Sequence, residues 1–164
     1  MPPAIKMIAA GGEIDPILGL RQFPETITGG DSYQANPTKD ASFASLINAV
    51  RLDAGSPALK YSAKLDKAAQ AHSNDMFANG KLTHTGSTAE TATVKLRAIR
   101  AGYNPTVIGE NIAKGQRNEN AVMNAWVKSK PHQANNVNAA FEDFGLARKG
   151  TGANTYWTLV LGAE

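Results

Sequence analysis

The order of helical and strand patterns along the chain predicts an α+β fold in which helices cover a mainly antiparallel sheet. Apolar residues recur at helical spacing through much of residues 40–128. The run Tyr156-Trp157-Thr158-Leu159-Val160-Leu161, near the end of the chain, has the aromatic and β-branched composition of a strand. Helices that come first and strands that gather late favour α+β over alternating βαβ units. A length of 164 residues fits one domain.

Residues 1–37 are predicted to form an extended arm that precedes a domain of residues 38–164. The arm is rich in proline, contains two Gly-Gly pairs, and shows no sustained periodicity. One short helical turn is expected at residues 16–18. Apolar residues such as Phe23 would allow the arm to pack on the domain.

The first two helices carry clear start and stop signals. Asp40 is suited to cap the first helix, which ends before Gly55. The second helix follows Ser62 and ends at Gly80. His72 falls on the apolar face of this second helix, where a histidine is more often a hydrogen-bonded core residue than a ligand.

A third helix is expected to start at a capping box formed by Ser87 and Glu90 and to end at Gly102. Ala92, Leu96 and Ile99 form its predicted apolar stripe.

The remaining elements alternate between strands and one more helix. A central strand is predicted at about 107–114, and a fourth helix at 118–128, broken by Pro131. Two late strands are predicted at 144–148 and 156–161, joined by a glycine-rich turn.

The overall composition excludes several classes of protein. The 17 basic and 14 acidic residues are mixed along the chain, so no nucleic-acid partner is expected. No apolar run approaches the roughly 18 residues of a membrane span. The chain has no cysteine, which excludes disulfides and thiolate metal sites. Residues 1–12 lack the apolar core of a signal peptide, which leaves a cytoplasmic protein or the mature part of an exported one.

Glu110 places a carboxylate within an apolar run. In a strand, Ile108, Glu110 and Ile112 lie on one face. A carboxylate on such a face is costly unless a cation, a hydrogen-bond donor or a metal meets it. The evident partners are the three histidines of the chain, His72, His84 and His132. The alternative is that backbone amides hold Glu110, which then only pins a loop.

Several fragments of the chain form an ordered set between residues 40 and 162. They are Leu46-Ile47-Asn48-x-x-Arg51, Ala71-His72-Ser73-x-Asp75-Met76, Thr83-His84-Thr85-Gly86, Ala101-Gly102-Tyr103, Gly109-Glu110-Asn111-Ile112-Ala113, Trp126-x-x-Ser129-x-x-His132, and Phe144-Gly145-Leu146-Ala147 with Tyr156-Trp157. The set resembles the CAP superfamily of cysteine-rich secretory proteins, antigen 5 and pathogenesis-related proteins, and in particular its bacterial SCP-like branch.

The resemblance implies a three-layer α-β-α sandwich with a cleft that holds His84, Glu110 and His132. Two imidazoles and a carboxylate are a plausible site for zinc or another divalent ion, with His84 and His132 as the metal ligands. A hydrogen-bonded network without metal is the alternative. Further residues expected at the ligand cleft are Ser129, Asn111 and His72.

The chain departs from the family pattern at two places near the cleft. Ser129 stands where eukaryotic members usually have a second glutamate, which removes an anionic charge. Pro131 stands where bacterial members commonly have glycine, directly before His132. The fold expectation survives these changes, whereas the affinity for a metal is put in doubt.

Three functions are compatible with these residues. The first is a secreted or periplasmic binding module, with its signal peptide removed, for a small ligand, a lipid or a cell-envelope component. The second is a metal-dependent hydrolase, protease- or nuclease-like, in which His84, Glu110 and His132 are the catalytic candidates. The third is a structural interaction scaffold. The absence of a Gly-x-Ser-x-Gly elbow or a His-Glu-x-x-His helix favours a role other than catalysis.

Overall fold

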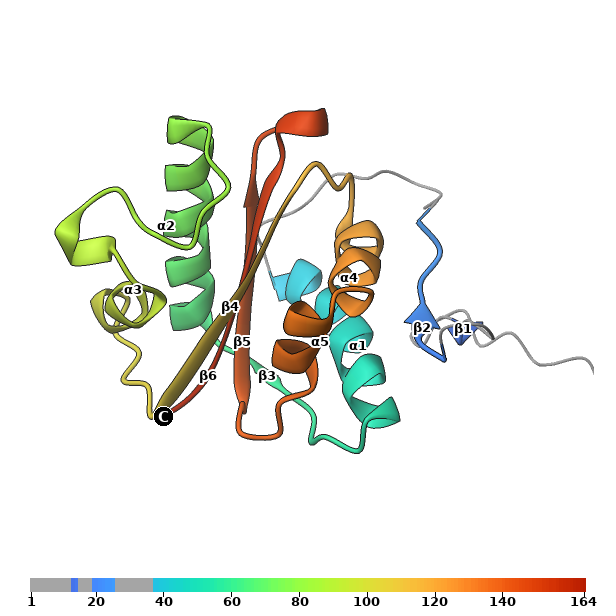
Figure 1. The fold of residues 1–164 in the computed structure, drawn as a ribbon. Coiled ribbons are helices and arrows are strands. Elements are labelled where there is room, and N and C mark those ends of the chain that lie inside the picture. Colours follow the sequence, from blue (N-terminus) through green and yellow to red (C-terminus); the bar gives the residue numbers. More distant parts are fainter. Residues whose placement is uncertain (1–12, 15–18, 26–36) are drawn as a thin grey trace, which may run out of the picture.

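In the computed structural model, two layers of helices enclose a twisted sheet (Figure 1). The structure describes residues 13–14, 19–25 and 37–164, without the side chains of Glu13 and of residues 37–41. The helices are α1 (Pro37–Asp53), α2 (Ala63–Asn79), α3 (Val94–Arg100), α4 (Glu119–Val127) and α5 (Lys130–Val137). The strands of the main sheet are β3 (Lys60–Tyr61), β4 (Val107–Lys114), β5 (Asp143–Lys149) and β6 (Tyr156–Ala163). Short 3-10 turns are η1 (Ala89–Thr91) and η2 (Gly152–Asn154).

The sheet has the strand order β3-β5-β6-β4. β6 pairs antiparallel with both β5 and β4, whereas the short β3 runs parallel to β5. Helices α2 and α3 lie on one side of the sheet and α1, α4 and α5 on the other (Figure 1). The predicted α-β-α sandwich with a mainly antiparallel sheet is therefore confirmed.

The predicted central strand lies at the edge of the sheet. β4 has the expected bounds and pairs with β6 over its whole length. Its other side has no neighbouring strand in the described part of the chain. The sequence did not reveal this position, because pairing order depends on contacts between distant segments. The free edge leaves room for loops to approach β4 from both faces of the sheet.

Helix α2 begins and ends at the predicted residues. The Ser62 hydroxyl accepts from the amide of Leu65 at 3.2 Å, and Gly80 ends the helix with a left-handed φ of 65°. The helix lies directly on β5. A Cβ at Gly145 would stand 2.1 Å from the Asp66 backbone nitrogen, so only glycine allows this close approach.

The predicted start of the third helix is wrong. The Asp75 carboxylate accepts hydrogen bonds from both the amide and the hydroxyl of Ser87, so Ser87 does not cap a helix. Thr93 caps α3 instead. The predicted apolar stripe is also wrong, because α3 buries Arg97 and Ala98. Leu96 and Ile99 are 39% and 48% exposed.

The region after Trp126 forms two helices. Pro131 does not simply end the fourth helix: it lies in the first turn of α5, where its missing N–H costs nothing. His132 is consequently a helical residue of α5 and not part of a loop.

The main apolar core lies between the sheet and the layer of α1 and α4. Its largest members are Phe43, Trp126, Phe144 and Trp157. Part of the predicted arm reaches this core. β1 (Glu13–Ile14) pairs with β2 (Arg21–Gln22), and Phe23 is 4% exposed within the core cluster. The predicted turn at residues 16–18 lies outside the described residues.

Arg51, from the first fragment of the ordered set, is fully buried and has a structural role. Its guanidinium donates to the carbonyl oxygens of Pro57, Asn136, Asn138 and Phe141 at 2.7–3.2 Å. These bonds connect α1 to the end of α5 and to the segment that leads into β5. They also hold α5 in the position from which it presents His132.

Candidate functional site

Glu110 is a buried carboxylate that two cationic or polar side chains hold. Its side chain is 3% exposed. One carboxylate oxygen accepts from Arg97 Nη2 at 2.7 Å, and the other accepts from His84 Nδ1 at 2.8 Å. Its neighbours on the same face of β4, Ile108 and Ile112, pack toward the layer of α2 and α3. The carboxylate therefore has the partners that its burial requires.

His84 presents an oriented imidazole ring to solvent. Its side chain is 61% exposed, although its Nδ1 bonds the buried Glu110. Because a carboxylate only accepts, Nδ1 carries the proton, and Nε2 is the ring nitrogen left for solvent or a ligand. The hydrogen bond to Glu110 raises the pKa of His84, an effect partly opposed by the burial of the ring.

Arg97 is the site residue that the sequence analysis missed. Its Nη1 donates to the backbone oxygen of Thr91 at 2.8 Å, and its Nη2 bonds Glu110. The side chain is 2% exposed, and its Nε is buried without a hydrogen-bond partner. Nothing in the sequence separates Arg97 from Arg100 on the same helix, because a buried arginine is recognised only by its acidic partner.

His72 lies in the core beside Glu110, as the apolar face of α2 predicts. It is fully buried, and its Nε2 lies 2.6 Å from the Thr83 carbonyl oxygen and 3.9 Å from Glu110. A carbonyl only accepts, so Nε2 donates, and the bond anchors the residue that directly precedes His84. Burial lowers the pKa of His72, although the charge of Glu110 opposes that shift.

Asn111 continues the network on the opposite face of β4. Its Nδ2 donates to the His132 carbonyl and to Asn136 Oδ1, both at 3.0 Å. Its Oδ1 accepts from Asn135 at 2.9 Å. The side chain is fully buried, so these bonds fix the position of α5 against β4.

His132 is oriented by Ser129. Its Nδ1 lies 2.7 Å from the serine hydroxyl, one turn earlier in the chain. Burial lowers the pKa of His132, and the charge of His84 lowers it further. The two imidazoles therefore lie within electrostatic range of each other.

The edge position of β4 explains how distant segments meet at this site. Successive strand residues point to opposite faces, so Glu110 holds the loop of His84 and Asn111 holds the helix of His132. His84 and the backbone of His132 are therefore both held at β4, one from each face of the strand. His72 and Arg97 lie behind Glu110, and Ser129 lies beside His132.

Of the three predicted metal donors, the imidazoles of His84 and His132 are the ones that remain available to a ligand or an ion. Both oxygens of Glu110 are already bonded, and no group of three or more His, Cys, Asp or Glu residues in the described chain is arranged to hold an ion. In both His84 and His132 the Nδ1 atom is hydrogen-bonded, and Nε2 is the ring nitrogen that remains available to a ligand. An imidazole oriented by a carboxylate is a common arrangement around metals.

Comparison with known proteins gives the same family at the levels of sequence and fold. The model of the CAP, or cysteine-rich secretory protein, family matches residues 44–161. The uncharacterized protein YkwD of Bacillus subtilis is 32% identical over 113 residues. That alignment covers 69% of this chain and 42% of YkwD, so the chain spans less than half the length of this relative.

Solved structures share the fold at low identity. An extracellular protein with an SCP domain from Bacillus anthracis aligns with a TM-score of 0.66 at 23% identity, over 81% of this chain and 45% of that one. An outer surface protein of Borrelia burgdorferi aligns with a TM-score of 0.68 at 22% identity, over 80% of this chain and 98% of that one. Within the described residues, no helix of this protein is both long and apolar enough to cross a membrane.

Proposed function

Since the chain belongs to the CAP family of cysteine-rich secretory proteins, we propose that it is an extracytoplasmic binding module whose cleft is built around His84 and His132. The extracellular and outer-surface descriptions of its structural neighbours support this location. The first occupant that we propose is a divalent ion such as zinc. A small ligand, a lipid or a cell-envelope component would complete the coordination or take the place of the ion.

One observation carries this proposal. His84 is largely exposed, yet its ring is fixed by a buried carboxylate that Arg97 holds from the other side. An exposed side chain normally samples several rotamers, and fixing one costs conformational entropy. In the folded protein the His84 rotamer is already fixed, so a ligand would bind without this entropy loss. Such pre-organisation is typical of a binding residue rather than of a solvated surface histidine.

The residues fit a metal ion with open coordination positions. His84 and His132 would supply two imidazole nitrogens, Glu110 and Ser129 would orient the rings from behind, and solvent or ligand atoms would fill the remaining positions. A bound ion would supply Lewis acidity to a ligand oxygen. With only two protein ligands, we expect weaker binding than at a structural zinc site.

A hydrolase is the second candidate, and the His84–Glu110 pair is the observation in its favour. A histidine whose pKa is raised by a carboxylate can act as a general base once it is deprotonated. No hydroxyl group of the described residues is hydrogen-bonded to His84. The pair therefore lacks the nucleophile of a serine or threonine hydrolase.

Zinc titration followed by calorimetry tests the proposal. We expect one equivalent of zinc to bind the wild-type protein and to raise its melting temperature, because a ligand that binds only the folded state stabilises it. The His84→Ala/His132→Ala variant should lose both effects. The two single variants should each bind at least about tenfold more weakly, which corresponds to roughly 1.4 kcal/mol.

Lys149→Ala is the control, because Lys149 is exposed on β5, which β6 separates from β4. This variant should keep the zinc equivalent even if its stability falls. Zinc binding that survives the double variant would contradict the proposed ligands. If no zinc binds, vesicles of envelope lipids and cell-wall glycans become the next probes, and failure of all of them would favour a scaffold in which the network only locks the loops.

A further inference from the structure

Three segments that are distant in sequence meet at one end of the sheet (Figure 1). Residues 77–82 end α2 and continue past it, residues 114–118 lead from β4 to α4, and residues 148–155 turn from β5 into β6. The Gly115 amide donates to the Thr155 carbonyl at 2.8 Å, which joins the second segment to the third. We refer to these three segments together as the basic end.

Two lysines of the basic end lie against aromatic rings. Lys114 and Lys149 are the register partners of Tyr156 on its two sides, so the three side chains share one face of the sheet. Lys114 Nζ lies 5.1 Å from the centre of the Tyr156 ring, and Lys149 Nζ lies 5.9 Å from the centre of the Phe77 ring. The two rings lie 6.4 Å apart, edge to face. The contacts therefore run without a break from one ammonium group through two rings to the other.

The basic end carries the positive charge of the whole protein. It contains no aspartate or glutamate, and its five basic residues are Lys81, Lys114, Arg117, Arg148 and Lys149. The formal net charge of the chain is +3, from 17 basic and 14 acidic residues, so the removal of these five would make it negative. In the described part of the chain, no carboxylate forms an ion pair with any of the three lysines. All three lysines are exposed and therefore available to an external anion.

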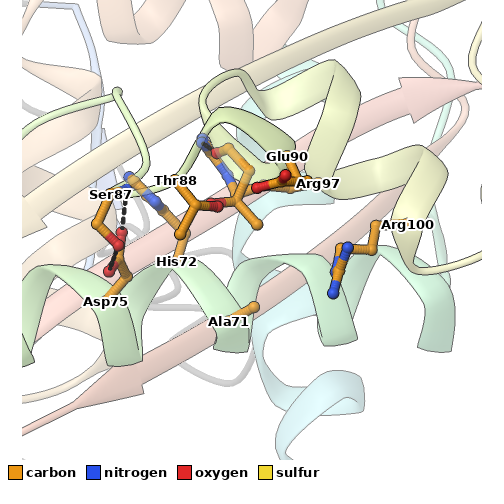
Figure 2. Close-up of a pocket in the computed structure, with 9 residues that line it drawn as sticks. Ala71, His72, Asp75, Ser87, Thr88, Glu90, Arg97 and Arg100 are labelled. Carbon is orange, nitrogen blue, oxygen red and sulfur yellow. Dashed lines mark hydrogen bonds between the residues drawn. The ribbon is translucent and has the colours of Figure 1, made fainter.

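The acidic residues of the protein lie outside this end. The nearest one along α2 is Asp75, whose carboxylate is bonded to Ser87 (Figure 2). At the opposite end of the strands, Glu142 and Asp143 lead into β5 and Glu164 follows β6. Because charge is separated along the strands, an anionic surface would attract the basic end and repel the other.

Phe77 adds an exposed apolar side chain to the basic end. One side of its ring packs on the hairpin, since a Cβ at Gly150 would stand 3.0 Å from a ring carbon. Phe77 is nevertheless 42% exposed, and Leu82, which follows α2, is 50% exposed. A dissolved polyanion gains nothing from exposed apolar side chains. The headgroup region of a bilayer accepts apolar side chains and, where its lipids are anionic, also attracts cations.

We propose that the basic end docks the protein on an anionic lipid bilayer, with Phe77 inserted among the headgroups and Lys114 and Lys149 bound to lipid phosphates beside it. A basic residue near an anionic surface strengthens partitioning about fivefold, so five of them give reversible attachment. This surface is separate from the imidazoles of the proposed metal cleft, and its occupancy does not require a metal.

Co-sedimentation with vesicles tests this inference. Vesicles of phosphatidylglycerol and phosphatidylcholine in equal parts are compared with vesicles of phosphatidylcholine alone, in the presence of a chelator. We expect the wild-type protein to bind only the anionic vesicles. Salt should release it between about 0.01 and about 1 M, because the Debye length falls from about 30 Å to about 3 Å over this range.

Two pairs of variants locate the contact. Lys114→Glu/Lys149→Glu should weaken vesicle binding at least about thirtyfold, because two attractions become repulsions. Lys60→Glu/Lys64→Glu has the same net charge, with both changes at exposed positions of the opposite end, and should bind like the wild type. Phe77→Ser should weaken binding about fivefold through lost apolar contact. Leu52→Ser, at a 76% exposed position of α1, should have no effect.

Phe77→Trp provides a direct readout of insertion. The native Trp126 and Trp157 are 1% and 0% exposed, so a new tryptophan at position 77 should dominate the response to vesicles. Its fluorescence should shift to shorter wavelength and be quenched by brominated lipids.

Three results would overturn the inference. The first is the absence of binding to anionic vesicles at low salt. The second is an equal loss in the two lysine double variants, which would indicate a response to net charge and not to this end. The third is binding to soluble polyphosphate that equals vesicle binding, together with an unchanged affinity of Phe77→Ser for vesicles, which would indicate a polyanion site.

Discussion

The two faces of the sheet are built from different chemistry. The face toward α1 and α4 carries one large apolar cluster, to which β6 contributes Trp157, Leu159 and Leu161. The face toward α2 and α3 has smaller apolar clusters, and among them lie buried polar groups. These groups are His72, Ser73, Arg97, Glu110 and Thr158. The other face also buries polar groups, among them Arg51, Asn111 and Asn136, and these bond backbone carbonyls and one another around α5.

The difference shows how the two faces contribute to stability and to the geometry of the buried side chains. Apolar burial is non-directional and tolerates small changes of shape, so the α1/α4 face can hold the sheet together. The buried ion pair of Arg97 and Glu110 and the imidazoles beside it need defined partners at defined distances, so the α2/α3 face also fixes the geometry of these side chains. Substitutions on the two faces should therefore differ in kind as well as in size.

The largest effect is expected from Arg97→Met. This change leaves the Glu110 carboxylate buried without its arginine, and the loss of one partner from a buried pair costs about 3–5 kcal/mol. Urea unfolding measures the change in the free energy of unfolding. The double variant Arg97→Met/Glu110→Leu should be more stable than the single one, because no buried charge remains. A single variant within about 0.5 kcal/mol of wild type would contradict the assigned role.

A similar or slightly smaller loss is expected from Leu159→Ala on the apolar face. Leu159 is fully buried in the large cluster, and truncation of such a residue costs about 2–5 kcal/mol. The NMR signals of the His84 ring should stay at their wild-type positions, since Leu159 faces away from Glu110. A displaced His84 signal would show that the two faces are coupled.

An intermediate loss is expected from Ser73→Ala. Ser73 Oγ lies 2.8 Å from Thr158 Oγ1 in the fully buried interface of α2 and β6. Removing one hydroxyl leaves the other with fewer partners, at a cost of about 1–3 kcal/mol. The isosteric double variant Ser73→Ala/Thr158→Val should recover much of this loss in thermal unfolding. A double variant less stable than the single one would show that the two hydroxyls stabilise the protein by more than satisfying each other's hydrogen bonds.

The smallest effect concerns the titration of the three histidines. NMR titration in the presence of a chelator should give His84 a pKa above the usual value of about 6.5, and His72 and His132 values below it. Because the folded pKa of His84 is raised, its stabilising contribution is fully present below about pH 6.5 and is lost as the pH rises through the folded pKa. His84→Gln should remove this dependence. A His84 pKa below that of His132 would contradict the geometry around Glu110.

The sequence by itself determined the elements whose signals are local. Caps and glycines marked α2, alternation marked β4 and β6, and the ordered fragments identified the family and placed His84, Glu110, Asn111 and His132 near one another. The placement of the four site residues was implied by the family resemblance, whereas the helix and strand signals depend on spacing and backbone preference within a few residues. For the same reason the expected burial of His72 was correct.

Only the tertiary structure decided which partners these residues meet. In the structure, β4 lies at the edge of the sheet, and α3 is oriented so that Arg97 and not Leu96 is buried. Ser87 donates a hydrogen bond to Asp75 and does not cap a helix. Each outcome depends on a contact between segments that are distant in sequence or that compete for one hydrogen bond. Sequence periodicity identifies the apolar side chains that a helix buries. An arginine such as Arg97 is buried only where a buried carboxylate from another element pairs with it, and this pairing exists only in the folded chain.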